Sequence, residues 1–338
     1  MVDREIAFVH RKIRVSCTQP INAGIEKAKI LKDKTYDPQL GFGVHQNDLS
    51  ELREKLSKLK IDNSTLGKVL DARRVELLKI IEMLKAVGSD SFSQKAISVY
   101  GRPDKELISK VKKFLELEVK EREFKYDTIS SIKGFLESLL GLGFKWTVME
   151  KEMLVGASFN IASRIIYINK NRKFSDHDLR RLIVHEIGTH IMRAENAMKQ
   201  KYKIFLIGFP GYLATEEGLA VYNEERAGLL SNEVLKNYAG RVMAVELSLK
   251  NSFSTVYNEL CEYFPKEQAW ILALRSKRGI SDTSKPGAYT KDHLYLKGWY
   301  DVKNFVKKGG RVEDLYIGKI GVEHVPVVKE LIRMKIVG

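Results

Sequence analysis

The chain has 338 residues, 44% of them hydrophobic and 30% charged, which is enough for one large or two ordinary domains with a buried core. Its 58 Lys and Arg outnumber its 43 Asp and Glu, and the resulting net charge of +15 favours anionic partners. No apolar run approaches the roughly 18 residues that cross a bilayer, so we do not expect a membrane-spanning helix.

The cysteines and the N-terminus predict the cellular setting. Cys17 and Cys261 are far apart and make no metal-binding pair, so we expect a reducing interior and a metal held, if at all, by nitrogen and oxygen atoms. The first residues, MVDREIAFVHRKIRV, carry charges within their only apolar stretch and form no secretory signal. We therefore expect a cytoplasmic protein with no membrane partner. Nucleic acid is not favoured, because the lysines are spread along the chain without a patch interleaved with aromatic residues.

The first part of the chain is predicted to be helical. Apolar residues recur at three- and four-residue spacing over 48–86, which predicts two amphipathic helices separated by a break at the letters DNS. Further helices are predicted over 103–123 and 127–141. This part holds no obvious chemistry. We expect residues 1–125 to form a helical region packed on a catalytic domain of residues 126–338.

The pattern then changes to short segments rich in β-branched and aromatic residues, at 144–150, 155–160 and 164–170. Such segments predict a small antiparallel sheet. A helix follows, with Ser175 as its N-cap and Asp178 three residues later in a capping-box variant. The expected fold class is α+β: a mainly helical, zincin-like metallopeptidase with a small antiparallel sheet beside the metal-binding helix.

That helix contains the sequence VHEIGTH, which has one residue more between its histidines than the zinc-protease pattern H-E-x-x-H. On a regular α-helix, His185 and His190 would point about 140° apart and could not share an ion. A π-bulge would absorb the extra residue, and Gly188 suits one because glycine tolerates unusual backbone angles. Alternatively, the helix ends at Gly188 and the second histidine approaches from a turn.

A catalytic zinc site needs a third protein ligand and one position for water. Glu217, in the string TEEGLAVYNEE, begins a second predicted helix, in the way that gluzincin peptidases supply a glutamate. Glu216 is the rival, one residue away, but the Glu-Gly-Leu-Ala string favours Glu217. We expect His185, His190 and Glu217 to hold one Zn²⁺ per chain. Glu186 would then accept the proton of a polarised water and deliver it to the leaving amine.

These motifs resemble those of the microtubule-associated tyrosine carboxypeptidase (MATCAP) family, whose microbial relatives carry a QEGLA motif. The strings PINAGIEKAKIL, YDPQLGF, GRPDKELISKV, LIVHEIGTHIMRAENA, GYLATEEGLAVYNE, YTKDHLYLKGWYDV and GKI occur in family order and extend over most of the chain. The present sequence has Glu216 where many relatives have Gln before the ligand glutamate, and it lacks a long N-terminal extension for binding microtubules.

The resemblance implies a zinc-dependent carboxypeptidase that removes a C-terminal residue, Tyr or another aromatic, from a protein or peptide. The implied partner is an acidic tail such as that of tubulin, which suits a basic enzyme. A carboxypeptidase also needs a cation for the terminal carboxylate, and arginine pairs with both of its oxygens. The candidates for substrate contact are the cations Arg193, Lys291 and His293, and the pocket or oxyanion tyrosines Tyr222, Tyr289 and Tyr295.

Two alternatives remain open from the sequence. An endo- or aminopeptidase could use the same zinc core, and an aminopeptidase would need an acid, for which Glu216 is a candidate, to hold the substrate amine. A non-catalytic regulatory or nucleic-acid-binding protein could retain the fold. An intact Glu186 argues against this second alternative, because a metal site without turnover does not need a base.

Overall fold

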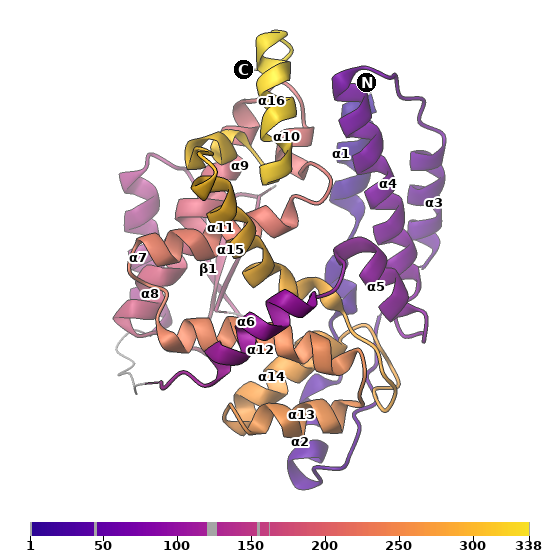
Figure 1. The fold of residues 1–338 in the computed structure, drawn as a ribbon, viewed down its shortest axis with the longest axis vertical. Coiled ribbons are helices and arrows are strands. Elements are labelled where there is room, and N and C mark those ends of the chain that lie inside the picture. Colours follow the sequence, from indigo (N-terminus) through magenta and orange to yellow (C-terminus); the bar gives the residue numbers. More distant parts are fainter. Residues whose placement is uncertain (1, 44–45, 120–126, 154–155, 162, 338) are drawn as a thin grey trace.

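The computed structural model describes residues 2–43, 46–119, 127–153, 156–161 and 163–337. It is mainly helical and contains one three-stranded sheet. In Figure 1, α1, α3, α4 and α5 stand together on one side of the molecule, and α7, α8 and the sheet lie on the opposite side.

The helices predicted over 48–86 and 103–123 are present as α3 (Gln46–Ser57), α4 (Thr65–Lys85) and α6 (Lys105–Leu115). The same part of the chain also contains three helices without an individual prediction, α1 (Val2–Lys12), α2 (Ala23–Lys32) and α5 (Phe92–Tyr100), and a 3₁₀ turn η1 (Val15–Thr18). The predicted break lies between α3 and α4, where Ser64 caps α4 by accepting a hydrogen bond from the backbone of Gly67. Asp104 caps α6 in the same way. This helix ends at Leu115, earlier than predicted, and positions 120–123 of the predicted helix lie outside the described residues.

The sheet differs from the prediction in its strand directions. It follows α7 (Thr128–Gly141) and consists of β1 (Thr147–Lys151), β2 (Ala157–Asn160) and β3 (Ile165–Asn169), in the order β1-β3-β2. β2 pairs with β3 antiparallel, but β1 pairs with β3 parallel, so the expected antiparallel sheet is in fact mixed. Strand β3 lies in the centre of the sheet, and its Ile166 and Ile168 are fully buried. Strand β1 is thereby separated from β2, its neighbour in sequence.

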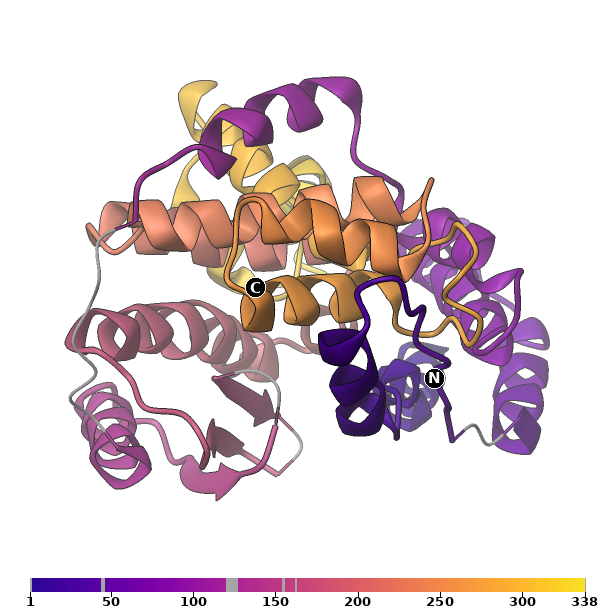
Figure 2. The same cartoon turned by 90° about the horizontal axis from the view of Figure 1, so that it is seen from below.

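One continuous helical rod carries the histidine motif. It consists of α8 (Asp176–Leu182), a π-helical segment η2 (Ile183–Ile191) and α9 (Met192–Lys199). The predicted capping box is present, since the Ser175 hydroxyl accepts from the backbone of Asp178 and the Asp178 carboxylate accepts from that of Ser175. The sheet and α7 lie on one side of this rod and the C-terminal helices on the other (Figure 2).

The C-terminal part of the chain is helical. It contains α10 (Ile204–Ile207), α11 (Leu213–Arg226), α12 (Asn232–Ser248), α13 (Phe253–Cys261), α14 (Lys266–Lys277), α15 (Leu294–Lys307) and α16 (Val325–Arg333), with 3₁₀ turns η3 (Thr290–His293), η4 (Val312–Ile317) and η5 (Val322–His324). No helix in the part of the chain that the structure describes is long and apolar enough to cross a membrane.

Three hydrophobic cores hold these elements together. One joins α1, α3, α4 and α5 to α10, α15 and α16, and a second joins α2 and α6 to α12, α13 and α14. The third fills the space between α7, the sheet and the rod. The first two cores each combine early and late parts of the chain. The domain boundary expected between residues 125 and 126 falls within the segment 120–126, which lies outside the described residues.

Helices α11 and α15 cross at two glycines. A Cβ atom added to Gly218 would lie 2.0 Å from the backbone carbon of Gly298, and one added to Gly298 would lie 1.7 Å from the carbonyl oxygen of Ala214. Because the neighbour in each case is backbone, no side chain can move aside to relieve the clash. The glycine in the TEEGLA string therefore allows α15 to approach the helix that carries Glu217.

We expect Gly218→Ala to destabilise the protein by at least about 3 kcal/mol, the upper end of the cost of overpacking where neighbours can yield. The matched control is Gly188→Ala, because a Cβ atom at that helical glycine meets no atom within 4 Å. It should be neutral or stabilising by up to about 1 kcal/mol. Thermal and denaturant unfolding measure both. Equal stability of the two variants would contradict a backbone-limited crossing of α11 and α15.

Candidate metal centre and active site

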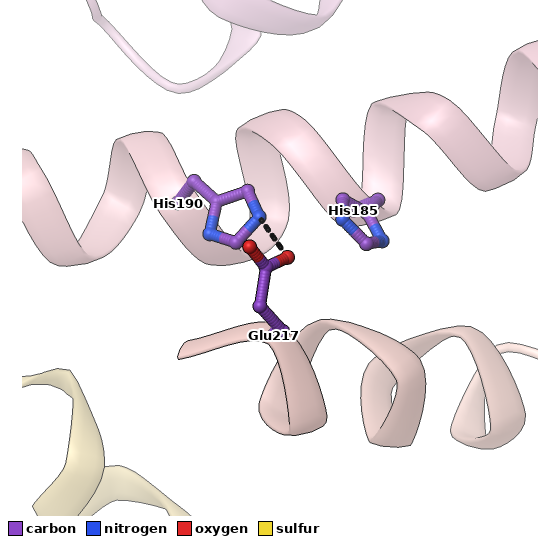
Figure 3. A group of neighbouring side chains, drawn as sticks. All are labelled: His185, His190 and Glu217. Atoms are coloured by element: carbon purple, nitrogen blue, oxygen red, sulfur yellow. Dashed lines mark ion pairs between the residues drawn. The ribbon is translucent and has the colours of Figure 1, made fainter. Parts of the chain in front are cut away.

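The π-helix brings the two histidines of the motif together. The rings of His185 and His190 lie 4.9 Å apart between centroids, and the carboxylate of Glu217 reaches them from α11 (Figure 3). One potential ligand atom from each residue lies within 4.8 Å of the other two. The backbone N–H of Met192 donates to the carbonyl of Ile187, five residues back. The helix thus continues through Gly188, as the π-bulge alternative predicted, and does not end there.

Gly188 shows neither a backbone angle nor a close contact that requires glycine. It is absent from the described residues with positive φ, and a Cβ atom there would meet no other atom within 4 Å. The tolerance of unusual angles that makes glycine suitable for a π-bulge is therefore not used at this position. The extra residue is instead absorbed over the nine residues of η2, Ile183–Ile191.

A carboxylate stands behind each histidine. Nδ1 of His185 is 2.7 Å from Oε1 of Glu224, and Nδ1 of His190 is 2.9 Å from Oε1 of Glu216. Such partners fix the tautomer and leave Nε2 of each ring for a metal. Nε2 of His190 lies 3.9 Å from Oε2 of Glu217. The geometry therefore places Glu217, rather than Glu216, in the group of three that could hold a metal, and Glu216 beside His190.

Positive charges keep these buried acids ionised. Burial alone would raise the pKa of Glu216, but Arg193, Lys319 and His190 hold that pKa well below its ordinary value. Burial likewise opposes ionisation of Glu217, and Lys291 together with the two histidines lowers its pKa. A carboxylate that remains charged at neutral pH is available to a cation without first losing a proton.

Glu186 has a different environment. Its side chain is buried, and burial raises its pKa to about 7, with His185 opposing the shift and Glu217 adding to it. A cation held by the three ligand candidates would lower this pKa by direct attraction. A carboxylate that titrates near neutrality can accept a proton and later return it, which is the behaviour of a general base and acid.

The donor set fits a zinc ion. It offers two imidazole nitrogens and one carboxylate oxygen, which zinc binds in catalytic sites with one position left for water. All three residues are buried, and both rings are oriented by carboxylates. Lys291 places its Nζ 3.2 Å from Oε1 of Glu217, so the carboxylate already attracts a positive charge.

A pocket of about 230 Å³ adjoins the motif on the side of His185 and Glu186. Its apolar wall comes from Leu182, Val234, Ile271 and Leu272, its aromatic wall from Tyr238 and Tyr295, and four guanidinium groups line it, those of Arg172, Arg181, Arg241 and Arg275. We call it the arginine pocket. Gly156 and Ala157, at the start of edge strand β2, form part of its rim.

The four arginines differ in their partners. Arg181 pairs with Glu224 at 3.0 Å, and Arg275 pairs with Asp292. In the described part of the chain, Arg172 and Arg241 form no ion pair, and the guanidinium carbon of Arg241 lies 4.5 Å from the Tyr295 ring centre. No pattern in the sequence predicted any of the four. They come from separate parts of the chain, and no spacing in the sequence connects them.

Four of the predicted substrate contacts lie elsewhere. Arg193 is fully buried and donates to Glu216 and to the carbonyls of three residues, Leu315, Gly318 and Ile320. Tyr289 is fully buried, with its hydroxyl directed to that of Tyr100. His293 is buried and bonded through Nδ1 to the carbonyl of Thr290. Tyr222 is half-buried and packs into the first two cores. These placements do not support direct substrate contact.

Two of the predicted contacts do border the site. Lys291 is partly exposed beside Glu217, with a quarter of its side chain accessible. Tyr295 lines the arginine pocket, and its ring lies 6.5 Å from that of His185 in a stacked orientation. Both residues come from the YTKDHLYLKG string, in which η3 leads into α15.

Comparison with known proteins identifies the family. A family model described as microtubule-associated tyrosine carboxypeptidase matches residues 31–338. The chain belongs to this family. The match confirms the resemblance based on the HEIGTH and EEGLA strings. It also includes both helices that carry the candidate ligands, α11 and the rod of α8, η2 and α9.

Several mammalian relatives align with part of this MATCAP-family chain. Mouse microtubule-associated tyrosine carboxypeptidase 1 is 31% identical over 125 residues, which are 35% of this chain and 26% of that protein. The human protein of the same name is 30% identical over 125 residues, with the same shares. The mouse protein MATCAP2 is 29% identical over 170 residues, 46% of this chain and 31% of that protein. The alignments thus span about a quarter to a third of the relatives' own length.

We expect the wild-type chain to bind one zinc ion, and Glu217→Gln to lose stoichiometric binding because a neutral amide replaces the anionic ligand. Glu216→Gln should retain the ion but bind it about 10- to 100-fold more weakly, the usual effect of a residue that orients a ligand. Metal analysis and chelator competition measure both. Zinc retained by Glu217→Gln and lost by Glu216→Gln would reverse the two assignments.

Proposed function

We propose that the protein is a zinc-dependent carboxypeptidase that removes the C-terminal residue of a protein or peptide. The observation that carries the proposal is the position of Glu186, at the wall shared by the His185–His190–Glu217 cluster and the arginine pocket. Membership of a family described as tyrosine carboxypeptidases supports the same activity. The rod and α11 hold the chemical groups, and the pocket offers room for a terminal residue.

The chemistry of hydrolysis divides between the ion and this chain's own residues. When bound, zinc supplies Lewis-acid chemistry that makes a water molecule more acidic and the scissile carbonyl more electrophilic. Glu186 accepts a proton from the attacking water, whose oxygen bonds to the carbonyl carbon, and returns it to the amine as the C–N bond breaks. Glu216 and Glu224 hold the imidazoles of His190 and His185 in one orientation throughout.

The arginine pocket supplies recognition of the substrate's end. Arg241 is the guanidinium we assign to the terminal carboxylate, because it has no ion-pair partner in the described part of the chain and lies against Tyr295 beside the site. The apolar wall and the tyrosines Tyr238 and Tyr295 suit an aromatic side chain. We therefore propose tyrosine, or another aromatic residue, as the preferred terminal residue.

The substrate chain preceding that residue is proposed to be acidic. The net charge of +15 favours carboxylate-rich partners, and Arg172, which forms no ion pair within the described residues, lines the pocket. Mammalian relatives carry names that describe microtubule-associated tyrosine carboxypeptidases, so an acidic tail like that of tubulin is a reasonable substrate to test.

The aminopeptidase alternative is less well supported. It needs an acid free to hold the substrate amine, and Glu216 was the candidate. Glu216 is instead bonded to His190 and to Arg193, both buried.

We expect Glu186→Gln to bind zinc and to lose about 10²- to 10⁴-fold in kcat, because the amide cannot accept the water proton. Peptides ending in Tyr, Phe, Ala or Lys, followed by mass spectrometry, measure turnover and rank the terminal residue. Metal content and thermal unfolding serve as controls for site and fold. Turnover that survives in Glu186→Gln, or cleavage within the peptide or at its N-terminus, would contradict the proposal.

Arg241→Ala should lower kcat/KM for a peptide with a free terminal carboxylate on the order of 10²-fold, as when one partner of a desolvated charge pair is removed. The same peptide with an amidated C-terminus should be a poor substrate for both the wild type and the variant. The substitution should therefore change kcat/KM for this peptide very little. The matched control is Arg226→Ala, an exposed arginine at the end of α11. An unchanged preference for acid over amide in Arg241→Ala would transfer the carboxylate contact to another cation.

A further inference from the structure

The π-helix that aligns the histidines has two of its backbone carbonyls bonded to side-chain hydroxyls. The Thr189 hydroxyl donates to the carbonyl of Val184 at 3.2 Å. The Tyr316 hydroxyl, from η4, donates to the carbonyl of Gly188 at 3.0 Å. Buried carbonyl groups need a donor, and a change of helical winding alters which backbone N–H is in reach. The two hydroxyls therefore bond to the segment within the motif where the winding is unusual.

Both hydroxyls are bonded in turn to one amide. Nδ2 of Asn223 lies 2.8 Å from the Thr189 hydroxyl oxygen and 2.7 Å from that of Tyr316. A side-chain amide nitrogen carries two hydrogens, so it can donate to both oxygens at once. Each hydroxyl then directs its own hydrogen to a carbonyl of η2. The hydrogen bonds run in one direction: from the amide to two hydroxyls, and from these to Val184 and Gly188.

This network connects the parts of the molecule that hold the metal candidates. Asn223 lies on α11, the helix that carries Glu217. Tyr316 lies in the segment 315–320, whose carbonyls at Leu315, Gly318 and Ile320 accept from Arg193 on the rod. The same segment brings Nζ of Lys319 to 3.8 Å from Oε1 of Glu216, which supports His190.

We propose that Tyr316 and Asn223 are positioning residues that hold residues 183–191 in the π-helical winding, and so hold His185 and His190 close enough to share one metal ion. The inference rests on the proposed function, since it assumes that the cluster binds zinc. A regular α-helix would turn the two histidines about 140° apart, whereas both hydroxyls donate to carbonyls of the π-helical segment. The network favours the winding that the site needs over the winding the backbone prefers.

Two isosteric variants test the proposal. Tyr316→Phe and Thr189→Val each remove one hydroxyl and keep the shape of the side chain. Each should weaken zinc affinity about tenfold, within the range for residues that orient a metal site. The visible absorption of the Co²⁺-substituted protein should also change, because it reports the coordination geometry rather than stability. The matched control is Tyr36→Phe, another half-buried tyrosine, whose hydroxyl donates to Glu26 far from the rod.

The readouts are zinc affinity by chelator competition, the Co²⁺ spectrum and thermal unfolding, none of which requires turnover. If the wild type binds zinc, and Tyr316→Phe and Thr189→Val match it in affinity and spectrum, the positioning role is wrong while the proposed function stands. If the wild type binds no zinc, the positioning role and the proposed function are both wrong. Should Tyr316→Phe not fold, Thr189→Val alone decides the result. The double variant should show a non-additive loss, because both hydroxyls depend on one amide.

Discussion

The winding of residues 183–191 is the constraint on which the candidate site depends. His185 and His190 are five positions apart, and only the π-helix brings both rings to one face of the rod. Because this winding is uncommon in proteins, the surroundings must favour it. They do so with hydroxyl donors from inside and outside the rod, and with the carboxylates of Glu216 and Glu224 that hold the two rings.

Helix α11 supplies most of these contacts, because residues at helical spacing along it face the rod. Glu217 and Glu224 are seven residues apart and share one stripe of the helix, as do Glu216 and Asn223 on the neighbouring stripe. The first stripe provides the candidate ligand and the partner of His185, and the second provides the partner of His190 and the amide that donates to Thr189. A single helix thus reaches the rod at four positions, and Gly218 lets α15 pack closely behind it.

The charges of the site explain how a basic protein can contain a buried acidic cluster. Glu216 and Glu224 are each bonded to an arginine, and Glu217 has Lys291 beside it, so these buried carboxylates are balanced within the site. Arg172 and Arg241 have no ion pair in the described residues. At the arginine pocket these two guanidinium groups lie among the carboxyl groups of Asp178, Glu186 and Glu233, and they remain available to an anionic group of a substrate.

Local chemistry made the helices and the motif predictable. Ser175 caps its helix as predicted, and Ser64 and Asp104 cap helices beside the predicted break and near the predicted start at 103, because a cap depends on residues only three positions away. The ligand candidates could be selected because the strings HEIGTH and EEGLA are short and specific. Choosing the π-helix over a helix end, assigning Glu216 to support rather than to the ligand set, and excluding Arg193 all required tertiary contacts.

The distinction between local and tertiary contacts also explains which features could not be predicted from the sequence. The parallel pairing of β1 with β3 and the convergence of four arginines at one pocket depend on residues that are distant in sequence and adjacent only in the fold. The sequence by itself therefore determined the family, the helical segments and the residue types of the metal candidates. Only the tertiary structure decided which charges are buried with partners and which remain at the pocket, because burial and pairing are properties of the packed chain.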